Sequence, residues 1–178
     1  GAIVVKITFM GTSHGYAEKD RFTSATLIEV SDFYYLLDAG APVEWIMVNA
    51  DKPCEKIRGI FITHMHNDHV GSLTSIIETM LCYRYNNNAV CFFPTENGKD
   101  SFLDWMKALH SSKDQILSTV EMGVTKEGRI YERNGLTVSA KYTKHIENES
   151  FSYVFEADGK KVLFTGDMKG GFPEYLKL

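Results

Sequence analysis

Residues 63–69, Thr-His-Met-His-Asn-Asp-His, hold three of the six histidines of the chain and one aspartate within six positions. The apolar run 57–62 before this motif predicts a buried strand. Apolar residues then recur after the motif at three- and four-residue steps, which predicts a helix. The motif is therefore expected in a strand-to-helix loop, where sheet proteins commonly carry functional groups.

The spacing within the motif predicts where its side chains point. In an extended segment, residues i and i+2 point to the same side, so His64 and His66 can face one ion. Asp68 and His69 follow where the chain turns into the helix, and they can face a second point nearby. Imidazole and carboxylate ligands suit zinc, and a mixed set also admits Fe or Mn. The alternative is a polar loop in which Asn67 or Asp68 only caps the helix.

Two downstream positions are expected to complete the site. His145 follows a predicted strand over 136–142, and Asp167 follows another over 161–164. Loops after buried strands can reach a shared sheet edge, so both side chains can approach the motif. A third imidazole would close the first metal site, and a carboxylate with two oxygens can bridge two cations. For His145, the alternative is an exposed loop histidine with no role.

The remaining pattern predicts a β-rich chain with helices packed outside two sheets. Strands are predicted over 3–9, 25–30, 33–37, 57–62, 89–93, 116–122, 128–131, 136–142, 151–156 and 161–164. Helices are predicted over 43–50, from the motif to about 84, and over 100–111. The pairs Asn134-Gly135 and Asp158-Gly159 predict hairpin turns.

Composition narrows the class of protein. The 178 residues, 44% hydrophobic and 24% charged, suit one globular domain, 1–178. We expect no membrane span, because no apolar run approaches the roughly 20 residues required, and no signal peptide. Three cysteines without a C-x-x-C spacing predict reduced thiols in a cytoplasmic protein. The formal net charge of −4 predicts no general attraction to nucleic acid or anionic membranes.

These residues resemble the metallo-β-lactamase fold superfamily of metal-dependent hydrolases. The resemblance is carried by the motif 63–69, by His145 and by Gly166-Asp167, and Leu37-Asp38-Ala39-Gly40 is similar to the superfamily's Asp-x-Gly strand end. It implies an α/β fold, namely an αββα four-layer sandwich. It further implies that one metal ion is held by His64, His66 and His145, a second by Asp68 and His69, and that Asp167 bridges them.

Within the superfamily, the opening resembles the ribonuclease Z and cyclic phosphodiesterase branch. This finer resemblance is carried by Met10-Gly11-Thr12-Ser13 and Lys19-Asp20-Arg21. Family members take a further histidine well downstream of the bridging aspartate, and the given sequence ends at Leu178 before such a position. We therefore expect the sandwich to lack its C-terminal strand and helix, unless another subunit of a homo-oligomer supplies them.

The expected reaction is hydrolysis by a metal-bound hydroxide, because coordination lowers the pKa of water toward ~7. Asp68 and Asp167 are the expected catalytic carboxylates, and the positive end of the following helix is expected to favour an anionic substrate. A small phosphodiester or a cyclic nucleotide is preferred; RNA is possible, although the acidic charge does not favour it. Alternatives are a thioester, lactone or β-lactam substrate, or a metal-binding module without turnover that assembles with a partner.

Three further residues have two interpretations each. Asp38 is a candidate acceptor that orients a ligand histidine, or a turn former at a strand end. His14 in the glycine-containing loop is a candidate substrate contact, or a solvated residue. Lys144 next to His145 is a candidate phosphate contact, although a solvated strand-end lysine is the simpler interpretation.

Overall fold

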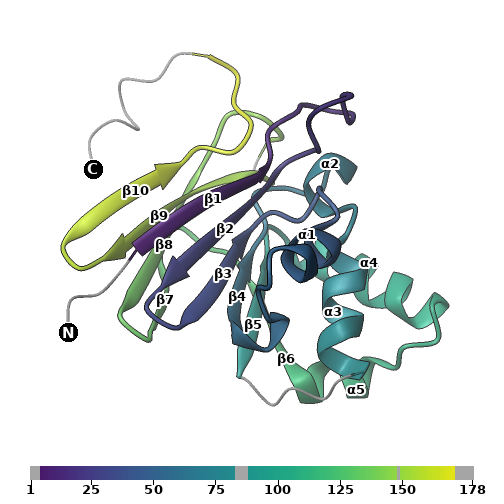
Figure 1. The fold of residues 1–178 in the computed structure, drawn as a ribbon. Helices are drawn as coiled ribbons and strands as arrows, with labels where there is room; N and C mark the ends of the chain where they lie inside the picture. Colours follow the sequence, from purple (N-terminus) through teal and green to yellow (C-terminus); the bar gives the residue numbers. More distant parts are fainter. Residues whose placement is uncertain (1–4, 83–87, 148, 171–178) are drawn as a thin grey trace.

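The structure, a computed structural model, describes residues 5–82, 88–147 and 149–170 (Figure 1). A six-stranded sheet has the order β1-β2-β3-β4-β5-β6, and a four-stranded sheet has the order β10-β9-β8-β7. The strands of the first sheet are β1 Val5–Gly11, β2 Ala25–Val30, β3 Phe33–Leu37, β4 Ile57–Phe61, β5 Ala89–Phe93 and β6 Val120–Val124. Those of the second are β7 Gly128–Arg133, β8 Leu136–Tyr142, β9 Phe151–Ala157 and β10 Lys160–Phe164.

The helices described lie on one side of the six-stranded sheet (Figure 1). They are α1 Val43–Asn49, α2 Asn67–Val70, α3 Leu73–Cys82, α4 Glu96–Ala108 and α5 Lys113–Thr119, with a short 3-10 turn at Cys54–Lys56. The four-stranded sheet packs against the opposite face. This mixed α/β arrangement of packed sheets and helices confirms the fold class expected from the sequence.

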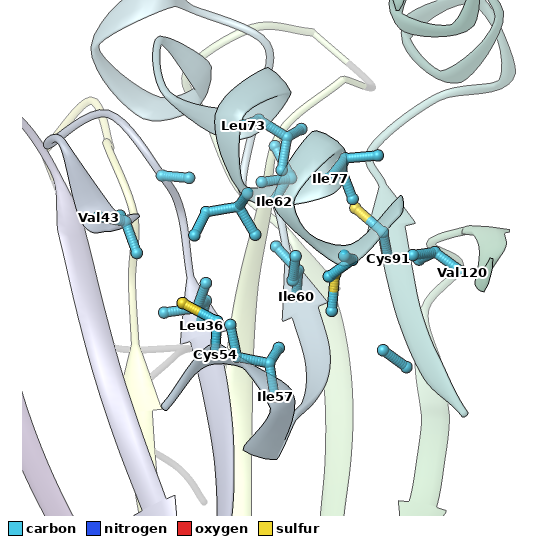
Figure 2. Packing of buried hydrophobic residues seen from close by; sticks show 14 of the residues in the cluster. Leu36, Val43, Cys54, Ile57, Ile60, Ile62, Leu73, Ile77, Cys91 and Val120 are labelled. Carbon is cyan, nitrogen blue, oxygen red and sulfur yellow. The ribbon is translucent and has the colours of Figure 1, made fainter. Parts of the chain in front are cut away.

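Two apolar cores hold these layers together. The first lies between the helices and the six-stranded sheet, where Ile60 and Ile62 face Leu73 and Ile77 of α3 (Figure 2). The second lies between the two sheets and centres on Phe61, whose ring contacts aromatic rings of the opposite sheet. Strand β4 is buried on both faces, which explains its nearly continuous apolar sequence.

The directions of the strands bring the loops of the candidate metal site to one edge of the six-stranded sheet. Strands β1, β2 and β3 are antiparallel neighbours, whereas β3, β4, β5 and β6 run parallel. The carboxyl ends of β3 and β4 therefore reach the same edge of the sheet. The β8–β9 connection and the end of β10 come to this edge from the second sheet, so one rim collects segments from both sheets.

The largest differences from the sequence prediction concern three elements. Residues 116–119, predicted as strand, belong to α5, because Ser112 and Gln115 form a reciprocal capping box that starts a helix. The single helix predicted after the motif is two, α2 and α3. The helix predicted over 100–111 begins earlier, at Glu96, where the Thr95 side chain accepts a hydrogen bond from the Gly98 amide. Positions 3–4 and 83–84 of predicted elements lie outside the described residues.

Candidate metal centre

Three imidazoles meet at the end of β4. His64 is fully buried and His66 is exposed, and their Nε2 and Nδ1 atoms lie 3.0 Å apart. His145, from the β8–β9 connection, brings its Nε2 to 3.3 Å from His66 Nδ1. One potential ligand atom from each of the three residues lies within 4.8 Å of the others. The i, i+2 pair predicted from the sequence thus faces the downstream histidine.

A second group shares His64 with the first. It consists of His64, His69 and Asp167, with ligand atoms again within 4.8 Å of one another. Asp68, expected in this group, has its Oδ2 3.4 Å from His69 Nε2. Asp167 lies between the groups, since its Oδ1 is 3.4 Å from His69 Nε2 and its Oδ2 is 3.9 Å from His145 Nε2. All six side chains singled out in the sequence therefore gather at one rim.

The carboxylate of Asp38 fixes the orientation of His69. Asp38 Oδ2 lies 2.7 Å from His69 Nδ1, and Oδ2 also accepts a hydrogen bond from Thr63 Oγ1. Asp38 Oδ1 accepts the Thr63 backbone N–H at 2.8 Å. Because a carboxylate accepts hydrogen bonds, His69 carries its proton on Nδ1, which leaves the Nε2 lone pair free. Asp38 reaches this position because its φ of 57° turns the chain sharply after β3.

Burial and charge shift the pKa of the groups at this rim. Burial lowers the pKa of His64 to about 3, helped by the neighbouring imidazoles, so His64 stays neutral at physiological pH. Burial alone would lower the pKa of His69, but the hydrogen bond and negative charge of Asp38 outweigh it and raise the pKa. Burial raises the pKa of Asp38 itself, against the opposing effect of its hydrogen bonds to His69 and Thr63.

The donor set fits a divalent metal ion. His69 Nε2 is buried and has no hydrogen-bond partner among the described residues, although two carboxylates lie close to it. A buried nitrogen lone pair without a partner is costly, and a metal ion would satisfy it. Imidazoles with aspartate oxygens are ligands that zinc, iron and manganese accept in proteins.

Two supports of the site give no local signal in the sequence. The backbone N–H of Gly15, in the β1–β2 loop, donates to Asp68 Oδ2 at 3.0 Å. Tyr153 in β9 is fully buried, and its hydroxyl donates to the carbonyl of Ile62, directly before the motif. Both contacts join segments more than 50 positions apart, so no periodicity or spacing indicates them.

Two other expectations from the sequence disagree with the structure. The helix that starts in the motif, α2, has only four residues, so its dipole contributes little to binding an anion. The residue at the N-cap position of α2 is His66, and no side chain makes a capping hydrogen bond there, which disagrees with the capping alternative for Asn67 or Asp68.

Cys54 and Cys91 are buried free thiols, and burial raises the pKa of both.

Comparison with known proteins agrees with this geometry. The family model for the anti-Pycsar protein Apyc1 matches residues 5–176. The chain belongs to this family. The match spans both sheets and every residue of the candidate metal centre.

Curated relatives of this Apyc1 family member include several ribonuclease Z proteins. Ribonuclease Z of Sulfurisphaera tokodaii is 31% identical over 153 residues, which are 86% of this chain and 48% of the relative. Ribonuclease Z of Trichodesmium erythraeum is 29% identical over 145 residues, which are 79% of this chain and 43% of the relative. The chain thus spans about half the length of these relatives.

Solved structures agree on the fold. The metallo-β-lactamase fold protein YhfI of Bacillus subtilis aligns with a TM-score of 0.72 at 16% identity, over 92% of this chain and 63% of that protein. The short form of human tRNase Z aligns with a TM-score of 0.71 at 20% identity, over 94% of this chain and 71% of that protein. These two matches confirm the metallo-β-lactamase fold expected from the sequence. Within the described residues, none of the helices is long and apolar enough to cross a membrane.

Proposed function

We propose that the protein is a metal-dependent phosphodiesterase whose metal ions are held by His64, His66, Asp68, His69, His145 and Asp167. The observation that carries this proposal is the position of Asp167, whose two oxygens face His69 and His145 respectively. A carboxylate placed between two groups of nitrogen ligands is suited to join two ions. Zinc is the proposed metal, and the same ligands admit iron or manganese.

The bound metal would supply a water of lowered pKa and an electrophilic centre for an oxygen of the substrate. The residues of the chain would orient the ligands and act on the water. Asp38 keeps the proton of His69 on Nδ1, so Nε2 faces the centre. Asp167, whose side chain is 44% exposed, is accessible to solvent and is proposed as one catalytic carboxylate, acting through the ions that it would join. Asp68 is proposed as the second catalytic carboxylate, held by the Gly15 N–H.

Local charge supports an anionic substrate despite the net charge of −4. The backbone N–H of Lys169 donates to the carbonyl of Lys144 at 2.8 Å, which ties together the segments that follow β10 and β8. Both lysines are exposed, and each lies within two positions of a proposed ligand, Asp167 or His145. Both lysines stand in segments that meet at this rim, and their positive charge would attract a phosphate group.

The relatives named ribonuclease Z support a phosphodiester as the bond attacked. For this chain we propose a small nucleotide diester in preference to a folded RNA, because its acidic composition gives no broad basic surface. A cytoplasmic location and a homo-oligomer stay predictions of the same proposal.

A panel of substrates tests the proposal. Metal-loaded protein should hydrolyse bis(p-nitrophenyl) phosphate, and His66→Ala should lose both the metal and the activity. A thioester and a cephalosporin are assayed in parallel. Preferential hydrolysis of either carbonyl compound would overturn the phosphodiester assignment, whereas a metal-loaded oligomer without any turnover would favour a binding module.

A further inference from the structure

Two exposed aromatic rings stand on the loop between β1 and β2. The ring centroids of His14 and Tyr16 lie 5.3 Å apart, and their planes are inclined at 52°. Tyr16 is 66% exposed, and His14 is exposed as well. The two rings together form a small aromatic surface in contact with solvent.

The loop holds this surface in a defined conformation. Ser13 is buried, its backbone N–H donates to the carbonyl of Phe22, and its hydroxyl donates to the carbonyl of Tyr16, both at 2.8 Å. The two contacts close the loop across its base and at its tip. The backbone that carries the rings is therefore ordered before a ligand binds, which reduces the entropy lost on binding.

The same loop touches the candidate metal centre. Gly15, which separates the two aromatic residues, donates its backbone N–H to Asp68 Oδ2 at 3.0 Å. Its φ of +45° allows the chain to turn there, and a side chain at this position would be strained. The residue between the two aromatic residues in the sequence thus contacts a proposed metal ligand directly.

We propose that the rings of His14 and Tyr16 bind the base of a nucleotide phosphodiester while its phosphate occupies the metal centre. This inference rests on the proposed function and deepens it. Aromatic side chains stack on the faces of bases with little dependence on sequence, and a nucleotide diester combines a planar base with a phosphate. His14 and Tyr16 are accordingly specificity-determining residues that act on the substrate and leave the metal ligands untouched.

Two diesters with the same leaving group separate the base from the phosphate. They are thymidine 5′-(p-nitrophenyl) phosphate, which carries a base, and methyl p-nitrophenyl phosphate, which does not. Tyr16→Ala should lower kcat/KM for the thymidine diester about 5- to 100-fold more than for the methyl diester. Tyr16→Phe should have the wild-type ratio of kcat/KM for the thymidine diester to kcat/KM for the methyl diester. His14→Ala should lower this ratio. Trp105→Ala, which removes an exposed ring from α4, is the matched control and should leave the ratio unchanged.

Binding gives a readout that is independent of turnover. Isothermal titration of the metal-loaded protein with thymidine 5′-monophosphate and with inorganic phosphate should show a weaker affinity for the nucleotide alone in Tyr16→Ala, at unchanged metal content. Equal losses for both diesters, or for both ligands, would overturn the inference while leaving the phosphodiesterase intact. If the wild-type protein hydrolyses neither diester, the proposed function is wrong and the inference is wrong with it.

Discussion

Asp38 Oδ2 and His69 Nδ1 lie 2.7 Å apart, although 31 positions separate the two residues in the sequence. This contact connects the end of β3 to the metal motif after β4. It selects the tautomer in which His69 Nε2 is free, and this nitrogen lacks any hydrogen-bond partner among the residues described. Asp38 is therefore positioned to orient the His69 ring, as an outer hydrogen-bond partner of a metal ligand does.

Replacing this acceptor should weaken metal binding. Asp38→Asn keeps the size of the side chain but removes the charge, and its amide can present the wrong group to His69. Loss of such an outer partner commonly lowers metal affinity about 10- to 100-fold. The metal dissociation constant, measured by competition with a chelator, checks this. The exposed Asp32→Asn, in the β2–β3 turn, is the control, and equal affinities in all three proteins would refute the role of Asp38.

Metal affinity should fall as the pH is lowered through the neutral range. The pKa of His69 is raised, so below that pKa a proton occupies Nε2 and must leave before a metal binds. Each proton displaced changes the affinity by about tenfold per pH unit. His64, with a pKa lowered to about 3, contributes no such dependence between pH 5 and 8. Chelator competition at several pH values measures the slope, and a flat profile would contradict the assignment of His69.

A methyl group on Gly40 should disturb the loop that carries the motif 63–69. A Cβ at this position would lie 1.7 Å from the backbone oxygen of Asp68, so the backbone of one segment has to move. Gly40→Ala should lower the free energy of unfolding by about 1–3 kcal/mol, as expected for overpacking, and weaken metal binding. Urea denaturation measures the first effect. At Gly170 a Cβ would have nothing within 4 Å, so Gly170→Ala should be nearly neutral.

The buried hydroxyl of Tyr153 should stabilise the junction between the two sheets. It donates to the carbonyl of Ile62 and lies 2.8 Å from Thr125 Oγ1. Tyr153→Phe leaves the Ile62 carbonyl without this donor and should cost about 1–3 kcal/mol in the free energy of unfolding. Tyr16→Phe removes an exposed hydroxyl and serves as the control. If both variants unfold at the same urea concentration as the wild-type protein, the hydroxyl does not hold the motif in place.

Local sequence patterns predicted much of the fold. The strands at 25–30, 33–37 and 89–93 match the structure, because alternation or apolar runs bounded by turn residues depend on neighbours along the chain. Residues 116–119 were assigned wrongly because their apolar content outweighed the capping box formed by Ser112. The break between α2 and α3 at Gly71 was missed for a similar reason: an apolar period continues across it.

In the candidate site as well, local sequence signals indicate some residues and not others. The four potential ligands within residues 64–69 could be recognised because residue type and close spacing are local signals. His145 and Asp167 were predicted only from their positions after strands and from the family resemblance. The structure brings all six side chains together. The contact of Gly15 with Asp68 uses only a backbone N–H, which every residue except proline possesses. Such a contact depends on the packing of two loops and cannot be recognised from residue types.

The metal content of the purified chain tests the central claim most directly. Elemental analysis after removal of free metal by gel filtration is expected to give at least one divalent ion per chain in the wild-type protein. His66→Ala should lose that ion, while His110→Asn, which changes a histidine outside the cluster, should retain it. A wild-type protein that binds no metal even when it is supplied, or a His66→Ala variant with unchanged metal content, would contradict the account.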